Sequence, residues 1–193
     1  MITKTLKTVL LLGLTFALFS FDLPKGWFKA GSDPDKYEMG IDKGSGQDGK
    51  NTATIQSKEK YIKGFGTLMQ QCLPEKYAGK RVKMTGYIKT KDVDQRAGFW
   101  FRVDGKNPKE PLAFDNMNDR RITGTTEWKK YEIVLDVAAD ATNLAYGALI
   151  IGTGKVWFDN ITFEVVDASS PSTDMYGVKK EVPAVPLNLN FED

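Results

Sequence analysis

The chain has 193 residues, enough for one domain with a substantial core. It has no histidine and one cysteine, Cys72, which excludes Ser-His-Asp and Cys-His catalysis, histidine-liganded zinc or iron, and an internal disulfide. Of its 27 basic residues, Lys4 and Lys7 lie in the first 20 residues, which contain no acid, so the remaining 25 basic residues balance the 25 acidic ones. A formally neutral remainder argues against a basic groove, and we expect no nucleic-acid partner.

Residues 1–20 have the pattern of a secretory signal peptide. Lys4 and Lys7 precede an apolar run at residues 9–19, which is too short for a membrane span. We therefore predict an exported protein (periplasmic, cell-surface or secreted) with no membrane span once the signal is removed. The alternative is a retained N-terminal anchor.

From Pro24 onward, short strand candidates alternate with turn residues. Between the first two lies a glycine-rich loop, residues 43–50. No helix follows this loop and it has no Gly-Lys-Ser/Thr ending, so it is not expected to bind phosphate. The strand candidates of this half are residues 37–42, 52–57, 64–73 and 81–90.

Residues 97–105 form the most informative strand candidate. Alternation places Phe99, Phe101 and Val103 on one face, and Trp100 and Arg102 on the other. One face can fill a core, while the other offers an aromatic ring beside a cation.

Further strands are predicted at residues 128–137, 144–151 and 156–166. Eight to ten short strands with almost no helical periodicity predict an all-β fold, an antiparallel β-sandwich over residues 24–166. Residues 167–186 are rich in Ser, Pro, Lys and acids, which is typical of a linker or loose tail.

Two segments carry a family resemblance: residues 125–131, Thr-Thr-Glu-Trp-Lys-Lys-Tyr, and residues 156–161, Val-Trp-Phe-Asp-Asn-Ile. They resemble one strand and the closing strand of the galactose-binding-like jelly rolls, a group that includes many non-catalytic carbohydrate-binding modules. The family's usual first strand is matched only at residues 188–192. We therefore predict that residues 187–193 supply the first strand in permuted order; the alternative is the start of a second module.

The resemblance implies that a ligand lies on the concave sheet face or in the loops at one end, where aromatic rings stack on sugars and polar side chains bond hydroxyls. The alternative is that Trp100 packs beneath a loop and that Arg102 pairs with Asp104 or Asp115. The candidate ligand-binding residues are Trp100, Arg102, Tyr87, Gln70, Asp115, Asn116 and Arg120.

The resemblance also implies a structural calcium ion. Asp159 and Glu192 match the family's carboxylate positions, the second only if residues 187–193 supply the permuted strand, and carbonyls of residues 44–50 would complete the shell. The alternative is a hydrogen-bonded Asp159 without metal.

The acidic residues are dispersed over turns and outward strand positions, so no carboxylate pair for glycoside hydrolysis is apparent. Cys72 is expected to be a small buried side chain. The resulting hypothesis is an exported, non-catalytic binding domain for a carbohydrate, a similar polar ligand or a cell-envelope component. The alternatives are a structural or protein-interaction domain of an envelope assembly and, third, an enzyme that uses carboxylates alone.

Overall fold

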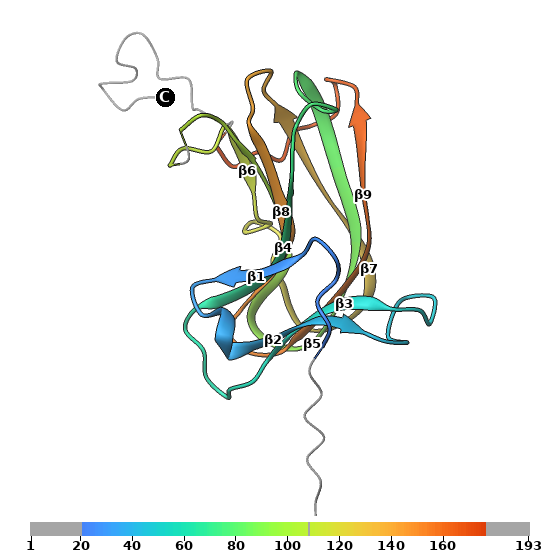
Figure 1. Ribbon diagram of the computed structural model, residues 1–193. Coiled ribbons are helices and arrows are strands. Elements are labelled where there is room, and N and C mark those ends of the chain that lie inside the picture. Colours follow the sequence, from blue (N-terminus) through green and yellow to red (C-terminus); the bar gives the residue numbers. More distant parts are fainter. Residues whose placement is uncertain (1–20, 108, 177–193) are drawn as a thin grey trace, which may run out of the picture.

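The computed structural model describes residues 21–107 and 109–176 (Figure 1). The predicted signal peptide, residues 1–20, and the predicted permuted strand, residues 187–193, lie outside the described residues. The described part is an antiparallel β-sandwich, which confirms the predicted fold class. It contains no helix that is long and apolar enough to cross a membrane. The elements are β1 (Phe28–Gly31), the 3-10 helix η1 (Pro34–Lys36), β2 (Tyr37–Asp42), β3 (Thr52–Ser57), β4 (Phe65–Cys72), β5 (Lys80–Asp104), β6 (Ala113–Asp115), β7 (Ile122–Val137), β8 (Asn143–Ile151) and β9 (Lys155–Val166).

The 25-residue strand β5 belongs to both layers of the sandwich (Figure 1). Its first half pairs with β7 and β9, and its second half pairs with β8 and β6. Between the halves, the register with β7 shifts three times from Ile88 to Ala97, and Asp92 has a φ of 52°. These irregularities bend the strand, since a β-bulge locally increases bend and twist. The sheet order β1-β4-β8-β5-β9-β3-β2 therefore folds over on itself.

The main core lies between the two layers. Phe99, Phe101 and Val103 are buried in it, as their alternation predicts. Aromatic contacts join the layers: Phe99 meets Phe158 of β9 edge to face at a centroid distance of 6.2 Å, and Tyr146 of β8 meets Phe163 at 4.7 Å.

A second apolar cluster lies on the outward face of the sheet. Met69 of β4, Trp100 of β5, and Ala145 and Leu149 of β8 are buried there, although they point away from the main core. A sheet face open to water normally carries polar residues, so this buried patch marks a place where the surface is hollowed or covered.

Residues 167–176 lie against the sandwich, although the sequence predicted a linker or loose tail for this region. The amide of Thr173 donates to the carbonyl of Val134 in β7 at 2.8 Å, and the amide of Met175 donates to the carbonyl of Phe114 in β6 at 2.8 Å. Hydrogen bonds to two strands fix this segment, and composition does not reveal such bonds. We call residues 172–176 the C-terminal strap.

Replacing Gly86 of β5 by alanine is expected to lower the free energy of unfolding by about 1–3 kcal/mol. A Cβ at Gly86 would lie 2.6 Å from Cζ of Phe99, because the Phe99 ring packs directly over this glycine. Denaturant unfolding measures the loss. In a Phe99→Leu background the same substitution should cost less; an equal cost in both backgrounds would show that the Phe99 ring is not the cause.

Candidate functional site

The outward apolar cluster forms part of the wall of a pocket of about 480 Å³. Strands β1, β4, β5, β6 and β8 contribute to it. The wall is mainly apolar, with a few polar side chains among the aromatic ones, as is usual for small-molecule sites. Its larger apolar residues are Phe28, Phe65, Met69, Trp100, Phe114, Leu149 and Ile151, and its polar residues are Thr67, Gln71, Arg96, Arg102 and Asn116.

Strand alternation decides which side chains reach this pocket. On β4, Thr67 and Met69 line the pocket, whereas Leu68 between them is part of the main core. On β5, Arg96 and Trp100 line the pocket, whereas Phe99 points inward. The pocket is therefore built on regular strands, which hold side chains more precisely than loops do.

Trp100 is held rigidly in the pocket wall. Only 7% of its surface is exposed, and its Nε1–H donates to Oγ1 of Thr67 at 2.8 Å. The Thr67 hydroxyl donates in turn to the carbonyl of Ala148 at 2.7 Å. Trp100 is therefore a fixed apolar surface within a pocket rather than an open stacking platform on a flat sheet.

The two arginines of the pocket differ in their charge partners. Nε of Arg102 lies 2.8 Å from Oδ1 of Asp104, so this cation is neutralised, as the alternative from the sequence proposed. Arg96 is half-buried and donates from Nη1 to the carbonyl of Asn116 at 3.1 Å. No carboxylate of a described residue lies within 4.0 Å of its guanidinium. Burial, and then repulsion from Arg121, lowers the pKa of Arg96.

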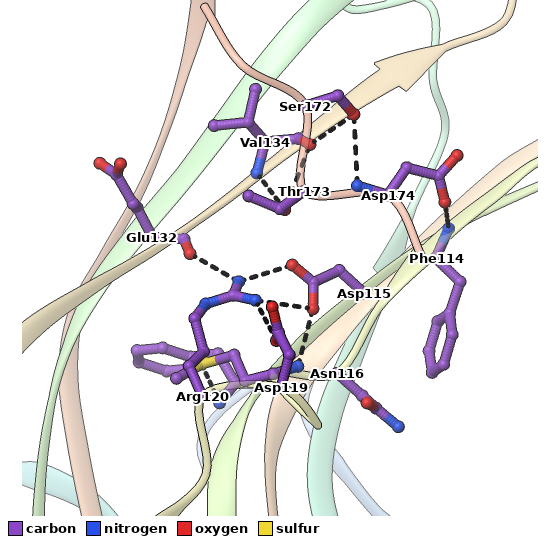
Figure 2. Close-up of polar contacts among 12 residues, drawn as sticks. Phe114, Asp115, Asn116, Asp119, Arg120, Glu132, Val134, Ser172, Thr173 and Asp174 are labelled. Carbon is purple, nitrogen blue, oxygen red and sulfur yellow. Dashed lines mark hydrogen bonds and ion pairs between the residues drawn. The ribbon is translucent and has the colours of Figure 1, made fainter. Parts of the chain in front are cut away.

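Asp115 and Arg120 form a structural ion pair away from the pocket (Figure 2). The Asp115 carboxylate is fully buried and accepts hydrogen bonds from the amide of Met117 at 2.7 Å and from the Arg120 guanidinium. Arg120 also donates to the carbonyl of Glu132 in β7 at 3.0 Å. Burial disfavours the charged guanidinium, but the bonds to Asp115 and Asp119 outweigh it and raise the pKa of Arg120. Both side chains are thus committed to holding β6, the following loop and β7 together.

Gln70 and Tyr87 are also absent from the described pocket wall. Gln70 accepts a hydrogen bond from the Tyr146 hydroxyl on the core side of the sheet. Tyr87 pairs in register with Asp159 and Lys130, in the first half of β5. Of the seven candidate ligand-binding residues, the structure brings together Trp100, Arg102 and Asn116. Sequence reasoning missed Arg96, which lies between the predicted strands at residues 81–90 and 97–105, although alternation along β5 places Arg96 on the face of Trp100.

Asp159 lies beside the glycine-rich loop, as the calcium hypothesis requires. A Cβ at Gly46 would be 3.1 Å from Oδ2 of Asp159 and 2.9 Å from the carbonyl oxygen of Lys50. The second predicted carboxylate, Glu192, lies outside the described residues. Within residues 21–107 and 109–176, no group of three or more Cys, Asp or Glu side chains could hold a metal ion. Calcium binding stays a prediction.

One curated relative is similar over most of the chain. It is a Bacillus subtilis (strain 168) protein named YbfP, an uncharacterized HTH-type transcriptional regulator, and it is 42% identical over 170 residues. These residues are 88% of this chain and 57% of the relative, so the chain spans little more than half of that protein. No family model matches the chain.

Solved structures establish the fold. The xylan-binding CBM22-1 domain of Paenibacillus barcinonensis Xyn10C has a TM-score of 0.54 at 14% identity, covering 78% of this chain and 92% of that domain. The enzymatically active domain of tailspike protein 4 from bacteriophage CBA120 has a TM-score of 0.56 at 10% identity, covering 74% of this chain and 20% of that one. The predicted resemblance to carbohydrate-binding modules is confirmed for the fold.

The predicted exported binding domain and its exported location are wrong. The finding that overturns both is the relative's name, an HTH-type transcriptional regulator, a role that conflicts with export. The envelope-assembly alternative depends on the same export and fails with it. The amino-terminal pattern on which the export hypothesis rested is a local one, a few lysines and an apolar run, which carries no information about the rest of the protein.

Replacing the buried Asp115 by asparagine is expected to lower the free energy of unfolding by about 3–5 kcal/mol, because the Arg120 guanidinium loses its buried anion. Asp119 contacts the same guanidinium at 2.8 Å, but 72% of its side chain is exposed. Asp119→Asn is therefore the matched control and should cost about 1 kcal/mol or less. Denaturant unfolding compares the two variants; equal losses would show that burial does not set the strength of this pair.

Proposed function

We propose that this β-sandwich is the ligand-sensing domain of a transcriptional regulator and that its outward pocket binds the effector. The observation that carries the proposal is the pocket of about 480 Å³, built on regular strands around Trp100. Its volume lies within the range of sites for small molecules, roughly 300–1,000 Å³.

The architecture supports a sensing role rather than a DNA-reading one. A helix-turn-helix reads the major groove with a helix, whereas the described residues hold one three-residue 3-10 helix and otherwise strands and loops. In the relative, the helix-turn-helix is therefore expected in the part of its length that this chain does not match. The expectation that this domain itself binds no nucleic acid stays part of the proposal.

We propose binding without catalysis. Among the described residues that line the pocket there is no Asp, Glu or Cys, and the chain has no histidine, so the pocket has no carboxylate, thiol or imidazole for acid–base or nucleophilic chemistry. Cys72 is exposed at the end of β4, not buried as expected from the sequence. Partial burial of its thiol, and then Glu75, raises the pKa of Cys72, which disfavours the reactive thiolate.

Phe114 connects the pocket to the C-terminal strap. Its ring lines the pocket and stacks on Tyr176 at a centroid distance of 5.9 Å. Its amide donates to Oδ1 of Asp174 at 2.9 Å (Figure 2). Its carbonyl accepts from the Met175 amide, so the C-terminal strap holds both backbone groups of this residue. A ligand that displaces Phe114 would displace the strap as well, so effector binding would change the position of residues 172–176.

The kind of effector we propose is a small molecule of about the size of a sugar. The xylan-binding neighbour supports including saccharides among the compounds tested. The pocket differs from an open sugar-binding face because its tryptophan is mostly buried, so apolar contact contributes more here than stacking on an exposed ring.

Filling the pocket is expected to abolish effector binding. Ala30 lines it, and Ala30→Trp would occupy the space beside Phe65 and Met69. A panel of saccharides and small organic acids is screened by thermal shift, where a ligand at 100 times its Kd stabilises by about 2.7 kcal/mol. Ala168→Trp, at an exposed site outside the pocket, is the control and should respond as the unmodified chain does. Ligands that stabilise the Ala30→Trp variant equally would contradict the proposal.

The regulatory half of the proposal is tested with a hybrid regulator. This chain replaces the matching 170 residues of the Bacillus subtilis relative, and transcripts are sequenced with and without a ligand found in the thermal screen. We expect transcript levels to change with ligand, and the Ala30→Trp hybrid not to respond. A transcript profile that ligand leaves unchanged in the unmodified hybrid would contradict a sensing role.

We also propose that a calcium ion is bound by Asp159 and carbonyl oxygens of the glycine-rich loop, which lie close together around Gly46. Calcium in excess should raise the melting temperature and a chelator should lower it, since an ion bound only by the folded state stabilises that state. Asp159→Asn should remove this response. Asp48→Asn changes an exposed carboxylate of the same loop that pairs with Lys50, and should keep it. A melting temperature that calcium and chelator leave unchanged would refute the site.

A further inference from the structure

We infer that the effector is a small carboxylic acid with an apolar body, and that Arg96 binds its carboxylate. The inference rests on the proposed function, because it assigns a ligand class to the same pocket. The first observation is how the half-buried arginines of the described part of the chain are paired.

Arg96 differs from the other half-buried arginines in what surrounds it. Arg120 is paired with Asp115, Arg102 with Asp104 and Arg81 with Asp136. Among the described residues, Arg96 donates one hydrogen bond, to the Asn116 carbonyl, and has no carboxylate within 4.0 Å. A guanidinium carries five N–H donors, and a partly buried cation without an anion is costly. Arg121 also lacks a described carboxylate partner, but its side chain is exposed and water can solvate it.

The charge of the pocket wall is therefore positive by about one unit. No acidic side chain of the described residues lines it, and Asp104 neutralises Arg102. Arg121 adds a positive potential, since its repulsion contributes to the lowered pKa of Arg96. A single negative charge on a ligand would balance the site. A guanidinium binds a carboxylate through two parallel hydrogen bonds, which fixes the orientation of the ligand as well as its charge.

The remainder of the pocket specifies the rest of the ligand. Phe65, Met69, Trp100 and Leu149 supply apolar surface for the body of the acid. Asn116 lines the pocket beside Arg96, and a side-chain amide both donates and accepts hydrogen bonds. A hydroxyl or N–H group on the ligand would suit this polar side of the pocket. An aromatic hydroxy acid has the carboxylate, the apolar body and the hydroxyl, whereas a uronic acid has the carboxylate and hydroxyls and offers only the C–H face of its ring as apolar surface.

Paired ligands test the charge directly. The aromatic pair is 4-hydroxyphenylacetate and 4-hydroxyphenylacetamide, and the sugar pair is glucuronate and glucuronamide. Binding to the full chain is followed by NMR of the indole N–H signals, with the Trp100 signal assigned from Trp100→Phe. We expect at least one carboxylate to bind about 10-fold or more tightly than its own amide, in keeping with a charge-assisted hydrogen bond. The pair that shows the preference distinguishes an aromatic source from a sugar source.

Variants assign the preference to one side chain. Arg96→Gln should reduce the acid-over-amide preference to about 2-fold or less. Arg121 is an exposed arginine outside the pocket, so Arg121→Gln should leave most of that preference. Arg96→Lys keeps the positive charge but cannot form two parallel hydrogen bonds, so it should retain part of the acid-over-amide preference. With two variants at this position, a folding defect in one of them still leaves the test. The melting temperature of each variant is measured alongside.

Two failures are distinguishable. Equal affinity for acid and amide, or a preference that survives Arg96→Gln, would overturn the inference and leave the pocket as a site for neutral ligands. If no member of either pair shifts the Trp100 signal, the inference is overturned. The proposed function then survives only if other compounds bind and Ala30→Trp blocks them.

Discussion

The structure depends on a single strand that serves both layers of a sandwich. The first half of β5 pairs with β7 and β9, and the second half pairs with β8 and β6. The bend near Asp92 turns Phe99 and Phe101 toward the opposite layer, so the same turn that closes the core presents Arg96, Trp100 and Arg102 on the outer face. The position of the pocket is therefore a consequence of how the core closes.

The ligand that the pocket favours depends on which of its polar groups already have a partner within the protein. Thr67 holds the Trp100 ring through a hydrogen bond, so the apolar wall is ordered before any ligand arrives, and less entropy is lost on binding. Arg102 is neutralised by Asp104, two residues further along the same strand face. The half-buried guanidinium of Arg96 is paired with no described carboxylate and gives the pocket a net positive charge. Pre-ordered apolar walls with one uncompensated cation favour small anions over neutral sugars.

Alternation along single strands predicted much of this arrangement, and contacts between distant strands explain what it missed. The faces of residues 99–103 were predictable because period-two alternation is local. The site itself was not, because β1, β4, β6 and β8 must meet around β5 before Trp100 lies in a pocket. Asp115 was predicted beside a ligand because a charged residue facing a core is unusual, whereas the structure buries its carboxylate, where the Met117 amide and Arg120, five residues later, satisfy it. The similarity to the Bacillus subtilis regulator could not be predicted, because no motif in the strands indicates a regulatory protein.

A crystal structure of the full chain, grown with the carboxylic acid that binds in the NMR titrations, tests the central claim most directly, namely that the outward pocket of β5 is the ligand site. We predict that the body of the acid lies against Phe65 and Trp100, with its carboxylate about 3 Å from the guanidinium nitrogens of Arg96. An acid bound elsewhere on the sandwich, or a pocket that stays empty of ligand at a saturating concentration, would contradict it.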